Sequence, residues 1–324
     1  MKTPQLTLPL LLLVSVTAAA NVDYGPLYVK AQSPLQAQSF TPMMRNAQQL
    51  NAGEWAYTLS GTIASVWAET PDYMMDYYHN SLDLGLRYAP AERWEIELAY
   101  QYRFAADNGL DSLTEGFHDL FGIGQNGRDK VPQDRFYISS EKYGVLLEDF
   151  EGETLTNMIS GYLGYQWLDQ GAHALSTGLG LSYNHVSSGP FALHSFEQLV
   201  QANYRYAPSE RHRLYLTLGA SHRNLDEVVG GIGINDWAYM YGMAYQYRFH
   251  PRHSLLLEYH GFSGETDDVN ELDSLSHEVL LGYRYHLKQG AIEFTMIENI
   301  FNMDNSTDIA FTLAYRGRIG ATQP

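Results

Sequence analysis

Apolar and polar residues alternate along most of the chain with a period of two, whereas a helix repeats every 3.6 residues. In the run at 94–104 the even positions are apolar or aromatic, and Glu95, Glu97 and Arg103 hold odd positions. Such alternation places one kind of side chain on each face of a β-strand. Twelve runs of this kind predict strands at 55–67, 78–88, 94–104, 159–167, 175–183, 196–206, 214–218, 237–249, 255–259, 279–285, 292–296 and 309–315.

The lengths of these runs favour strands that cross a membrane. Several extend over at least 11 residues, and a tilted transmembrane strand needs roughly 9 to 11. Aromatic residues lie near both ends of the apolar face, as with Trp55 and Trp67 or Trp237 and Phe249, which is typical of the two interfacial girdles of an outer-membrane barrel. A soluble β-sandwich or barrel is the alternative, since it also alternates. We predict an all-β, transmembrane antiparallel β-barrel of about 12 strands, because the polar face suits a wet lumen.

The first twenty residues predict a secretory signal peptide. Lys2 precedes an apolar stretch from Leu6 to Val16, and Ala18 and Ala20 form an A-x-A cleavage pattern. A buried core helix is the weaker alternative, because charge, length and cleavage site all agree with a signal. We therefore divide the chain into a signal peptide (1–20), a periplasmic N-terminal segment (21–52) that can pack into the lumen, and the barrel (53–318).

Composition narrows the partners of the protein. The 324 residues include no Cys, which excludes a disulfide scaffold and a Cys-ligated metal site. There are 20 Lys and Arg against 37 Asp and Glu, a net charge of −17, so nucleic acid is not expected as a partner. A mean hydropathy of −0.30 argues against a polytopic helical membrane protein. We expect outer-membrane lipid, lipopolysaccharide and the barrel assembly machinery as partners, although the last strand lacks the terminal aromatic residue common in such barrels.

The lengths of the connections predict the orientation. Short turns at 89–93, 169–173, 207–211, 250–252 and 288–290 alternate with longer connections. Barrels of this class have short periplasmic turns and longer outer loops. Both termini are therefore expected in the periplasm.

Charged residues at inward positions predict a belt near the periplasmic mouth of the lumen. The belt contains Arg87, Arg205, Arg248, Arg284 and Arg316, with Glu95, Glu97, Glu258 and Glu293 on neighbouring strands. Cross-strand ion pairs are one interpretation, because buried charges are tolerated when they are paired. An anion-selective constriction is the other.

The outer connections are acidic, and one of them is long. Of the 37 acidic residues, 24 fall within 69–77, 106–154, 224–236, 263–274 and 302–308. Clustered carboxylates can hold a divalent cation such as calcium, while solvated loop charge is the alternative. In the connection at 106–154, residues 110–121 have apolar positions at helical spacing. We predict a short helix there that caps the barrel mouth or binds a partner.

Two segments carry a resemblance to a known family. They are GPLYVKAQSPL at 25–35 and DSLTEGFHDLFGIGQNGRDKVP at 111–132. The second contains the spaced motif Phe117, His118, Phe121, Gly122, Gly127 and Arg128. Both resemble the uncharacterised proteobacterial envelope family called domain of unknown function 3187. The resemblance implies an outer-membrane barrel of unassigned function, with no catalytic residues to transfer.

One constellation could carry chemistry. His185 and Ser187 are two residues apart at the outer end of a predicted strand, with Glu197 and Gln198 on the next strand. A nucleophilic Ser needs a base and an orienting acid or amide. The arrangement resembles outer-membrane phospholipase A and barrel lipid A deacylases, which would make His185 the base, Ser187 the nucleophile, and Gln198 or Glu197 the orienter. The Asn-containing segment of the phospholipase is missing. The alternative is an interfacial His beside loop serines.

The sequence therefore favours a non-enzymatic barrel, either a narrow channel or a structural envelope protein. An outer-leaflet lipid hydrolase that uses the His-x-Ser pair is the alternative.

Overall fold

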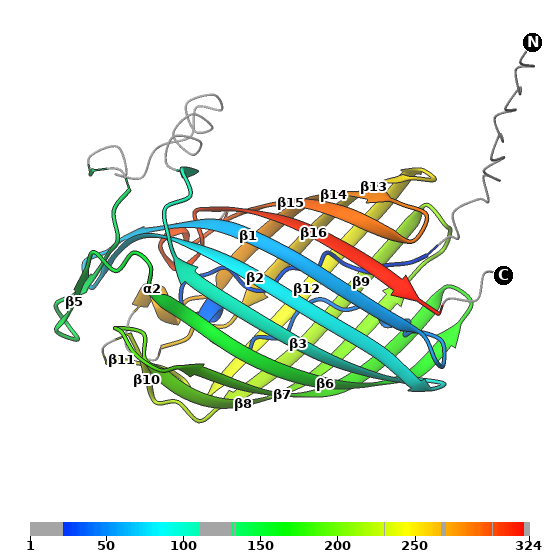
Figure 1. The fold of residues 1–324 in the computed structure, drawn as a ribbon, viewed down its shortest axis with the longest axis horizontal. Helices are drawn as coiled ribbons and strands as arrows, with labels where there is room; N and C mark the ends of the chain where they lie inside the picture. The colour runs from blue at the N-terminus through cyan, green and yellow to red at the C-terminus, as the bar shows by residue number, and fades with distance from the viewer. Residues whose placement is uncertain are drawn as a thin grey trace, which may run out of the picture.

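The computed structural model describes residues 22–110, 131–132, 134–229, 231–266, 270–299 and 301–320. They form a barrel of antiparallel strands in which each strand pairs with its neighbours along the chain, and pairing of the first strand with the last closes it (Figure 1). The strands are β1 (Trp55–Glu69), β2 (Met74–Ala91), β3 (Trp94–Ala105), β6 (Thr154–Gln170), β7 (His173–Val186), β8 (Leu193–Tyr206), β9 (His212–Arg223), β12 (Trp237–His250), β13 (His253–Phe262), β14 (Ser276–His286), β15 (Gly290–Glu298) and β16 (Ile309–Ile319). The predicted twelve-stranded antiparallel barrel is confirmed.

The smaller elements lie at one end of the barrel, which we call the long-loop end; the other is the short-turn end. The hairpin of β4 (Tyr137–Ser140) and β5 (Val145–Glu148) pairs with the start of β2 and extends the wall past that end (Figure 1). A second hairpin joins β10 (Glu227–Val228) to β11 (Ile232–Gly233). The helical turns are η1 (Gln36–Gln38), α2 (Asn270–Asp273) and η3 (Met303–Asn305). No helix among the described residues is long and apolar enough to cross a membrane. The helix predicted at 110–121 falls largely outside the described residues.

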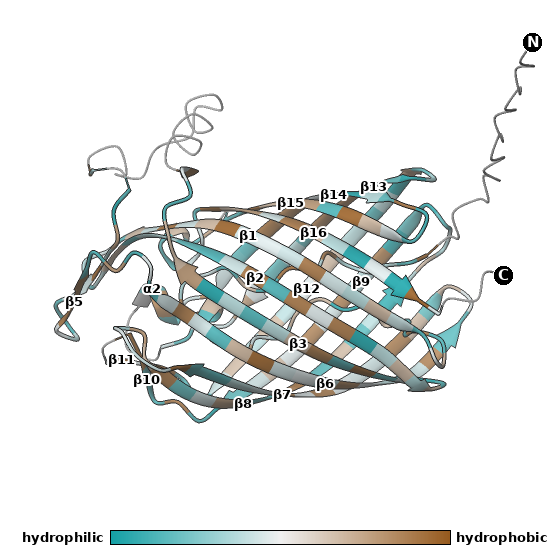
Figure 2. Cartoon of the chain, in the orientation of Figure 1, coloured by the Kyte–Doolittle hydropathy of each residue, from teal (hydrophilic) through white to brown (hydrophobic). Residues whose placement is uncertain are grey.

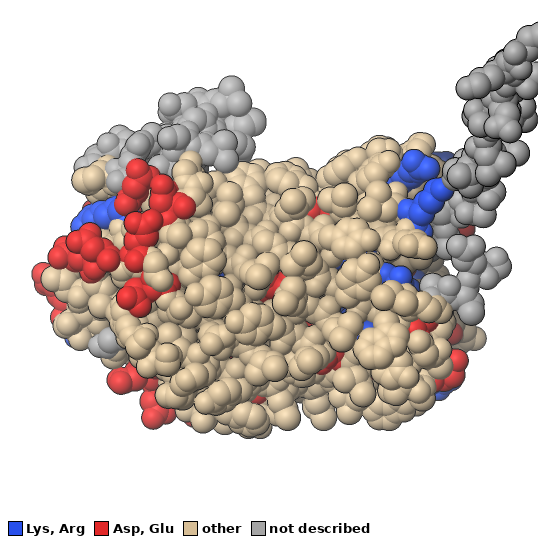
Figure 3. Space-filling view, viewed as in Figure 1, with Lys and Arg blue, Asp and Glu red and all other residues tan. Residues whose placement is uncertain are grey.

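The two faces of the wall follow the alternation in the sequence. Along β8, buried and exposed residues alternate with almost no exception. On β7, Leu179 and Leu181 are exposed outside, while Ser182 and Asn184 are buried inside. Apolar bands run round the outside, and charged residues gather at the two ends, mostly acidic ones at the long-loop end and both acidic and basic ones at the short-turn end (Figures 2 and 3). An apolar belt of this kind is the outer surface of a membrane barrel, not of a soluble one.

The N-terminal segment (residues 22–50) lies inside the barrel, where none of its residues is exposed (Figure 1). It starts at the short-turn end, where Arg318 of β16 donates to the Asp23 carbonyl oxygen. It reaches the long-loop end at η1, where Gln36 donates to the carbonyl of Ser263, just after β13. It then returns, and the Gly53 N–H donates to Ala89 near the end of β2. The segment thus makes one excursion through the lumen and back.

An apolar cluster closes the long-loop end. It joins Leu35 of the N-terminal segment to residues from strand ends and loops. Its members include Val66, Tyr73, Tyr77, Phe136, Phe150, Phe191, Ile234, Leu272 and Ile309. The rings of Phe136 and Phe150 pack edge to face with centroids 5.6 Å apart. This end is therefore closed by hydrophobic packing.

The position of the apolar belt predicts where a charge is tolerated. Leu218, in the middle of β9, is 64% exposed, and Leu146, on the β5 hairpin, is 60% exposed. We expect Leu218→Arg to lower the free energy of unfolding by about 2 to 4 kcal/mol, because a charge would face hydrocarbon. Leu146→Arg should change it little, because this hairpin extends past the barrel. Urea titrations of both variants in lipid vesicles measure the difference, and equal losses would contradict the assigned belt.

Candidate functional site: the occupied lumen

Carboxylates of the barrel wall bind backbone N–H groups of the N-terminal segment. This segment makes no ladder with a strand, so its buried peptide groups need other partners. Glu278 of β14 accepts the N–H of Gln32 at 2.7 Å, the N–H of Ser33 at 2.8 Å and the Ser33 hydroxyl at 2.9 Å. Further pairs are Leu27 to Glu258 (2.7 Å), Tyr28 to Glu293 (3.3 Å), Phe40 to Glu197 (2.7 Å) and Leu50 to Glu95 (3.2 Å).

Arginines and amides of the wall bind the carbonyl oxygens of the same segment. Arg284 of β14 donates to Gly25 at 2.7 Å and to Pro26 at 3.2 Å, and Arg316 of β16 donates to Pro26 at 2.7 Å. Arg103 of β3 donates to Ala31 at 3.0 Å and also to Ala37. Amides contribute as well, from Asn184 to Gln38 (3.1 Å) and from Gln201 to Met43 (2.8 Å). The wall therefore provides partners for N–H groups and for carbonyl groups of the backbone it encloses.

Glycines in the wall make room for side chains of the N-terminal segment. A Cβ added at Gly242 would lie 2.1 Å from the sulfur of Met44, and one at Gly219 would lie 2.6 Å from the Cβ of Pro42. Similar close approaches occur at Gly85 with Tyr28, Gly180 with Phe40 and Gly282 with Leu27. The wall is thus shaped to hold this segment, and larger residues at these positions would push it out.

Two charged side chains of the N-terminal segment pair with the wall. Arg45 makes a bidentate ion pair with Glu97, at 2.6 and 3.1 Å, and its guanidinium lies 3.9 Å from the ring centroid of Tyr162. At the short-turn end, Asp23 meets β8 and β9. These contacts anchor the segment at two places.

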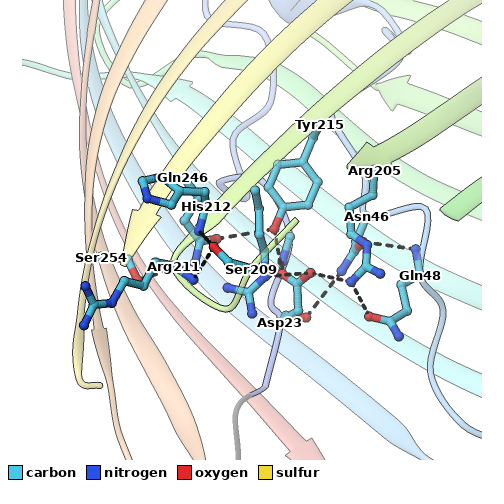
Figure 4. A network of polar contacts seen from close by, with 12 residues as sticks. Asp23, Asn46, Gln48, Arg205, Ser209, Arg211, His212, Tyr215, Gln246 and Ser254 are labelled. Atoms are coloured by element: carbon cyan, nitrogen blue, oxygen red, sulfur yellow. Dashed lines mark hydrogen bonds and ion pairs between the residues drawn. The ribbon is translucent and has the colours of Figure 1, made fainter. Parts of the chain in front are cut away.

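The carboxylate of Asp23 is surrounded by donors (Figure 4). One oxygen accepts the Tyr215 hydroxyl at 2.7 Å and the Gly25 N–H at 2.8 Å. The other lies 3.3 Å from Nη1 of Arg205 and 3.5 Å from Nε of Arg213. Burial alone would raise the pKa of Asp23, but the charge of Arg213 and the hydrogen bond from Tyr215 lead the effects that lower it to about 2. The carboxylate is therefore ionised at neutral pH.

The residues of the predicted belt all turn inward, and each of them has a partner. Arg87 pairs with Glu95 at 3.2 Å, and Glu293 pairs with Arg284 at 2.7 Å and with Arg316 at 3.3 Å. Cross-strand ion pairs thus occur, as one of the two interpretations expected. The other belt residues bind elsewhere: Glu97 to Arg45, Arg205 to Asp23, Arg248 to the Pro251 carbonyl (3.1 Å), and Glu258 to Leu27 and to His260 (3.1 Å).

Several lumen residues were missed by the sequence analysis. Arg213 and Tyr215 have the inward parity of β9, opposite to Leu214 and Leu216, so their direction could have been read from the alternation. Glu278 has the same inward parity on β14. What the pattern could not supply was their partner, since no periodicity marks residues 22–50.

The structure does not assemble the proposed hydrolase site. His185 lies on the outer face of β7, with Nδ1 2.8 Å from Nδ1 of His194, and Ser187 lies beyond the end of that strand. Gln198 is paired opposite Leu181, four residues from His185 and hence roughly 13 Å along the strand. Glu197 points into the lumen, where it binds the Phe40 N–H, so the wall separates it from His185. The structure therefore places neither Glu197 nor Gln198 beside His185.

Two further expectations concern the loops. The motif at Phe117, His118, Phe121, Gly122, Gly127 and Arg128 lies outside the described residues. Among the residues that the structure describes, no three His, Cys, Asp or Glu side chains are grouped to hold a metal ion. The suggested calcium site therefore gains no support from the described loops.

Little open space remains around the N-terminal segment. One cavity of about 20 Å³ lies beside Tyr28, Met43 and Arg45, and another of about 10 Å³ lies beside Lys30 and Phe40. Each has room for about one water molecule. Neither of these two cavities, which are lined by described residues, has room for a larger solute.

A family model described as "Protein of unknown function (DUF3187)" matches residues 3–319. The chain belongs to the DUF3187 family. This confirms the resemblance found in the two sequence segments. A comparison with curated proteins finds no match for this DUF3187 member.

Solved structures share the barrel fold of this DUF3187 member. The COG4313 outer membrane channel from Pseudomonas putida F1 superposes with a TM-score of 0.53 at 13% identity, covering 85% of this chain and 98% of the channel. The NanC porin gives a TM-score of 0.45 at 8% identity, covering 81% and 100%. The CymD monoaromatic hydrocarbon channel gives 0.42 at 9%, covering 83% and 89%. The first of these likenesses establishes an outer-membrane barrel fold.

The contacts of Glu278 predict that it holds the N-terminal segment in place. Glu278→Ala removes the acceptor for the amides of Gln32 and Ser33. We expect hydrogen exchange at these amides to become roughly 10- to 100-fold faster, because hydrogen bonds to charged groups contribute about 1.5 to 3 kcal/mol. Mass spectrometry of the 30–40 peptide measures the exchange. Glu210→Ala, in an exposed turn, is the control, and equal protection in both variants would argue against this role.

Proposed function

We propose that this protein is a non-enzymatic channel of the outer membrane, closed in this structure by its own N-terminal segment. The observation that carries the proposal is the way in which residues 22–50 are bound. Their backbone is held in the lumen mainly by charged side chains such as Glu278 and Arg284. Water can replace these polar partners when the segment leaves. The segment also buries apolar side chains such as Leu27 and Phe40 against the wall, and exposing them adds to the cost of leaving.

The inner surface of the wall favours a channel over a purely structural barrel. A twelve-stranded barrel encloses only a modest bore, and side chains of the wall could fill it. Here Gly85, Gly180, Gly219, Gly242 and Gly282 leave the space to a separate segment. Withdrawal of the segment would leave a lumen lined largely by polar and charged groups, and would remove Leu35 from the apolar cluster at the long-loop end.

The proposal includes an orientation. We infer that the short turns face the periplasm and that the acidic long loops face outward, beside lipopolysaccharide, because this is the usual arrangement of such barrels. The barrel assembly machinery would insert the protein in this orientation. The N-terminal segment would then enter the lumen from the periplasm.

A reversible lock on the segment tests whether it closes the channel. The hydroxyl oxygens of Ser33 and Ser276 are 2.7 Å apart, one on the N-terminal segment and one on β14, and the chain has no cysteine of its own. In Ser33→Cys/Ser276→Cys, a disulfide should tie the segment to the wall. We expect ionic currents through planar bilayers to vanish in the oxidised protein and to return on reduction.

A second cysteine pair controls for the cross-link itself. The hydroxyls of Thr62 on β1 and Thr312 on β16 are 2.8 Å apart, and both lie on the wall. Oxidised Thr62→Cys/Thr312→Cys should conduct as the parent does. If currents persist while the disulfide holds the segment in the lumen, closure of the channel by residues 22–50 is contradicted. Silence of the parent and of every reduced variant would favour a structural protein.

A further inference from the structure

The surroundings of Asp23 form a built site for a carboxylate group. Tyr215 is fully buried and Arg213 is 5% exposed. Both belong to β9, while Arg205 comes from β8, so the rigid wall holds all three side chains in place. In Figure 4 the side chains of Tyr215 and Arg205 point toward the Asp23 carboxylate. Asp23 itself belongs to the N-terminal segment, so the acid is carried by the movable part and the donors by the fixed part.

The site holds more donors than one aspartate uses. Among the described residues, Nη1 of Arg213 and Nε of Arg205 are buried without a hydrogen-bond acceptor, and Nε of Arg213 reaches Asp23 only at the ion-pair distance of 3.5 Å. Buried guanidinium donors usually find acceptors, since an unsatisfied one costs free energy. Two arginines also face a single carboxylate, although Arg205 has a second acceptor in Gln48, at 2.7 Å. The spare donors fit a ligand with more acceptor oxygens than the side chain of Asp23.

The site is close to solvent. Nη2 of Arg205 lies 3.9 Å from a carboxylate oxygen of Asp169, whose side chain is 43% exposed at the short-turn end. A solute at this mouth would therefore meet Arg205 first. Withdrawal of only the start of the N-terminal segment would free the remaining donors.

We propose that Arg205, Arg213 and Tyr215 form the binding site for the carboxylate group of a small organic acid, the solute of the channel, and that Asp23 occupies this site in the closed state. This inference rests on the proposed channel function. The solute competes with Asp23 for the same donors, so its arrival weakens one anchor of the segment that closes the lumen. Solute binding and opening are coupled because they use the same two arginines.

Chemical rescue tests the site directly. Asp23→Ala removes the resident carboxylate and leaves its place empty. Acetate is the probe, and saturation-transfer NMR of the full chain refolded in detergent measures its binding. Acetate should bind Asp23→Ala about tenfold more tightly than it binds the parent, because the charged Asp23 side chain competes for the same donors only in the parent. Acetamide, which has the same shape but no charge, should not bind.

A matched pair of arginine substitutions localises the binding. Added to Asp23→Ala, Arg213→Gln should abolish acetate binding, whereas Arg211→Gln should leave it unchanged, because Arg211 is exposed in the preceding turn. Acetate that does not bind Asp23→Ala, or that binds equally well after Arg213→Gln, would overturn the proposal. If Asp23→Ala fails to refold in chloride buffer, recovery of folded barrel with acetate, and not with acetamide, supports the site. Failure of acetate to restore folding would overturn it.

Conductance separates this inference from the channel itself. If both hold, acetate added at the short-turn side should increase the open time of the parent, and chloride at equal ionic strength should not. If the protein conducts but does not bind acetate, the channel function is supported and the proposed carboxylate site is contradicted. A protein that binds acetate but never conducts would contradict the channel, and with it the role of this site in solute passage.

Discussion

Hydrogen bonding between buried charges of the wall and the backbone of residues 22–50 is the interaction on which this structure depends. A peptide segment without a helix or a strand partner is costly to bury. Carboxylates and guanidiniums inside a barrel are costly as well, unless they are paired. Here Glu278 and Arg284 solve both problems together, since each satisfies the segment and is satisfied by it. Without the other, the segment and the wall would each have buried polar groups that lack hydrogen-bond partners. When they separate, water must therefore form these hydrogen bonds on both sides.

The two ends of the barrel are closed by different interactions, hydrophobic packing at one end and ion pairs at the other. At the long-loop end, Phe136, Phe150 and Leu35 belong to an apolar cluster that excludes water. At the short-turn end, Asp23 holds the start of the N-terminal segment through buried ion pairs with Arg205 and Arg213, and Arg205 also reaches the exposed Asp169. Water and ions at this mouth can therefore compete for part of the network, whereas an apolar cluster separates only when its area is exposed to water. Movement should therefore begin at the short-turn end.

The sequence predicted the wall well because a strand in a membrane barrel has one lipid face and one polar face. Trp237 to Phe249 could be read residue by residue from that alternation, and the inward direction of Arg284 and Glu293 followed from the same parity. Contacts between distant parts of the chain leave no such mark: Tyr28 and Glu293 are 265 positions apart. The hairpin of β4 and β5 was also missed, because strands of four residues are too short for periodicity to show. The spacing of His185 and Ser187 gave no partner either, although the inward direction of Glu197 follows from the parity of its own strand.

The excursion of residues 22–50 into the lumen and back has a topological consequence. The segment enters and leaves the barrel at the same end. The barrel therefore surrounds a loop of chain, and the chain does not pass through from one end to the other. Pulling on its ends would draw it out without parting a single pair of strands, and it could be inserted into a wall that had already closed. The pairing of β1 with β16 would therefore stay intact if the segment left the lumen as proposed.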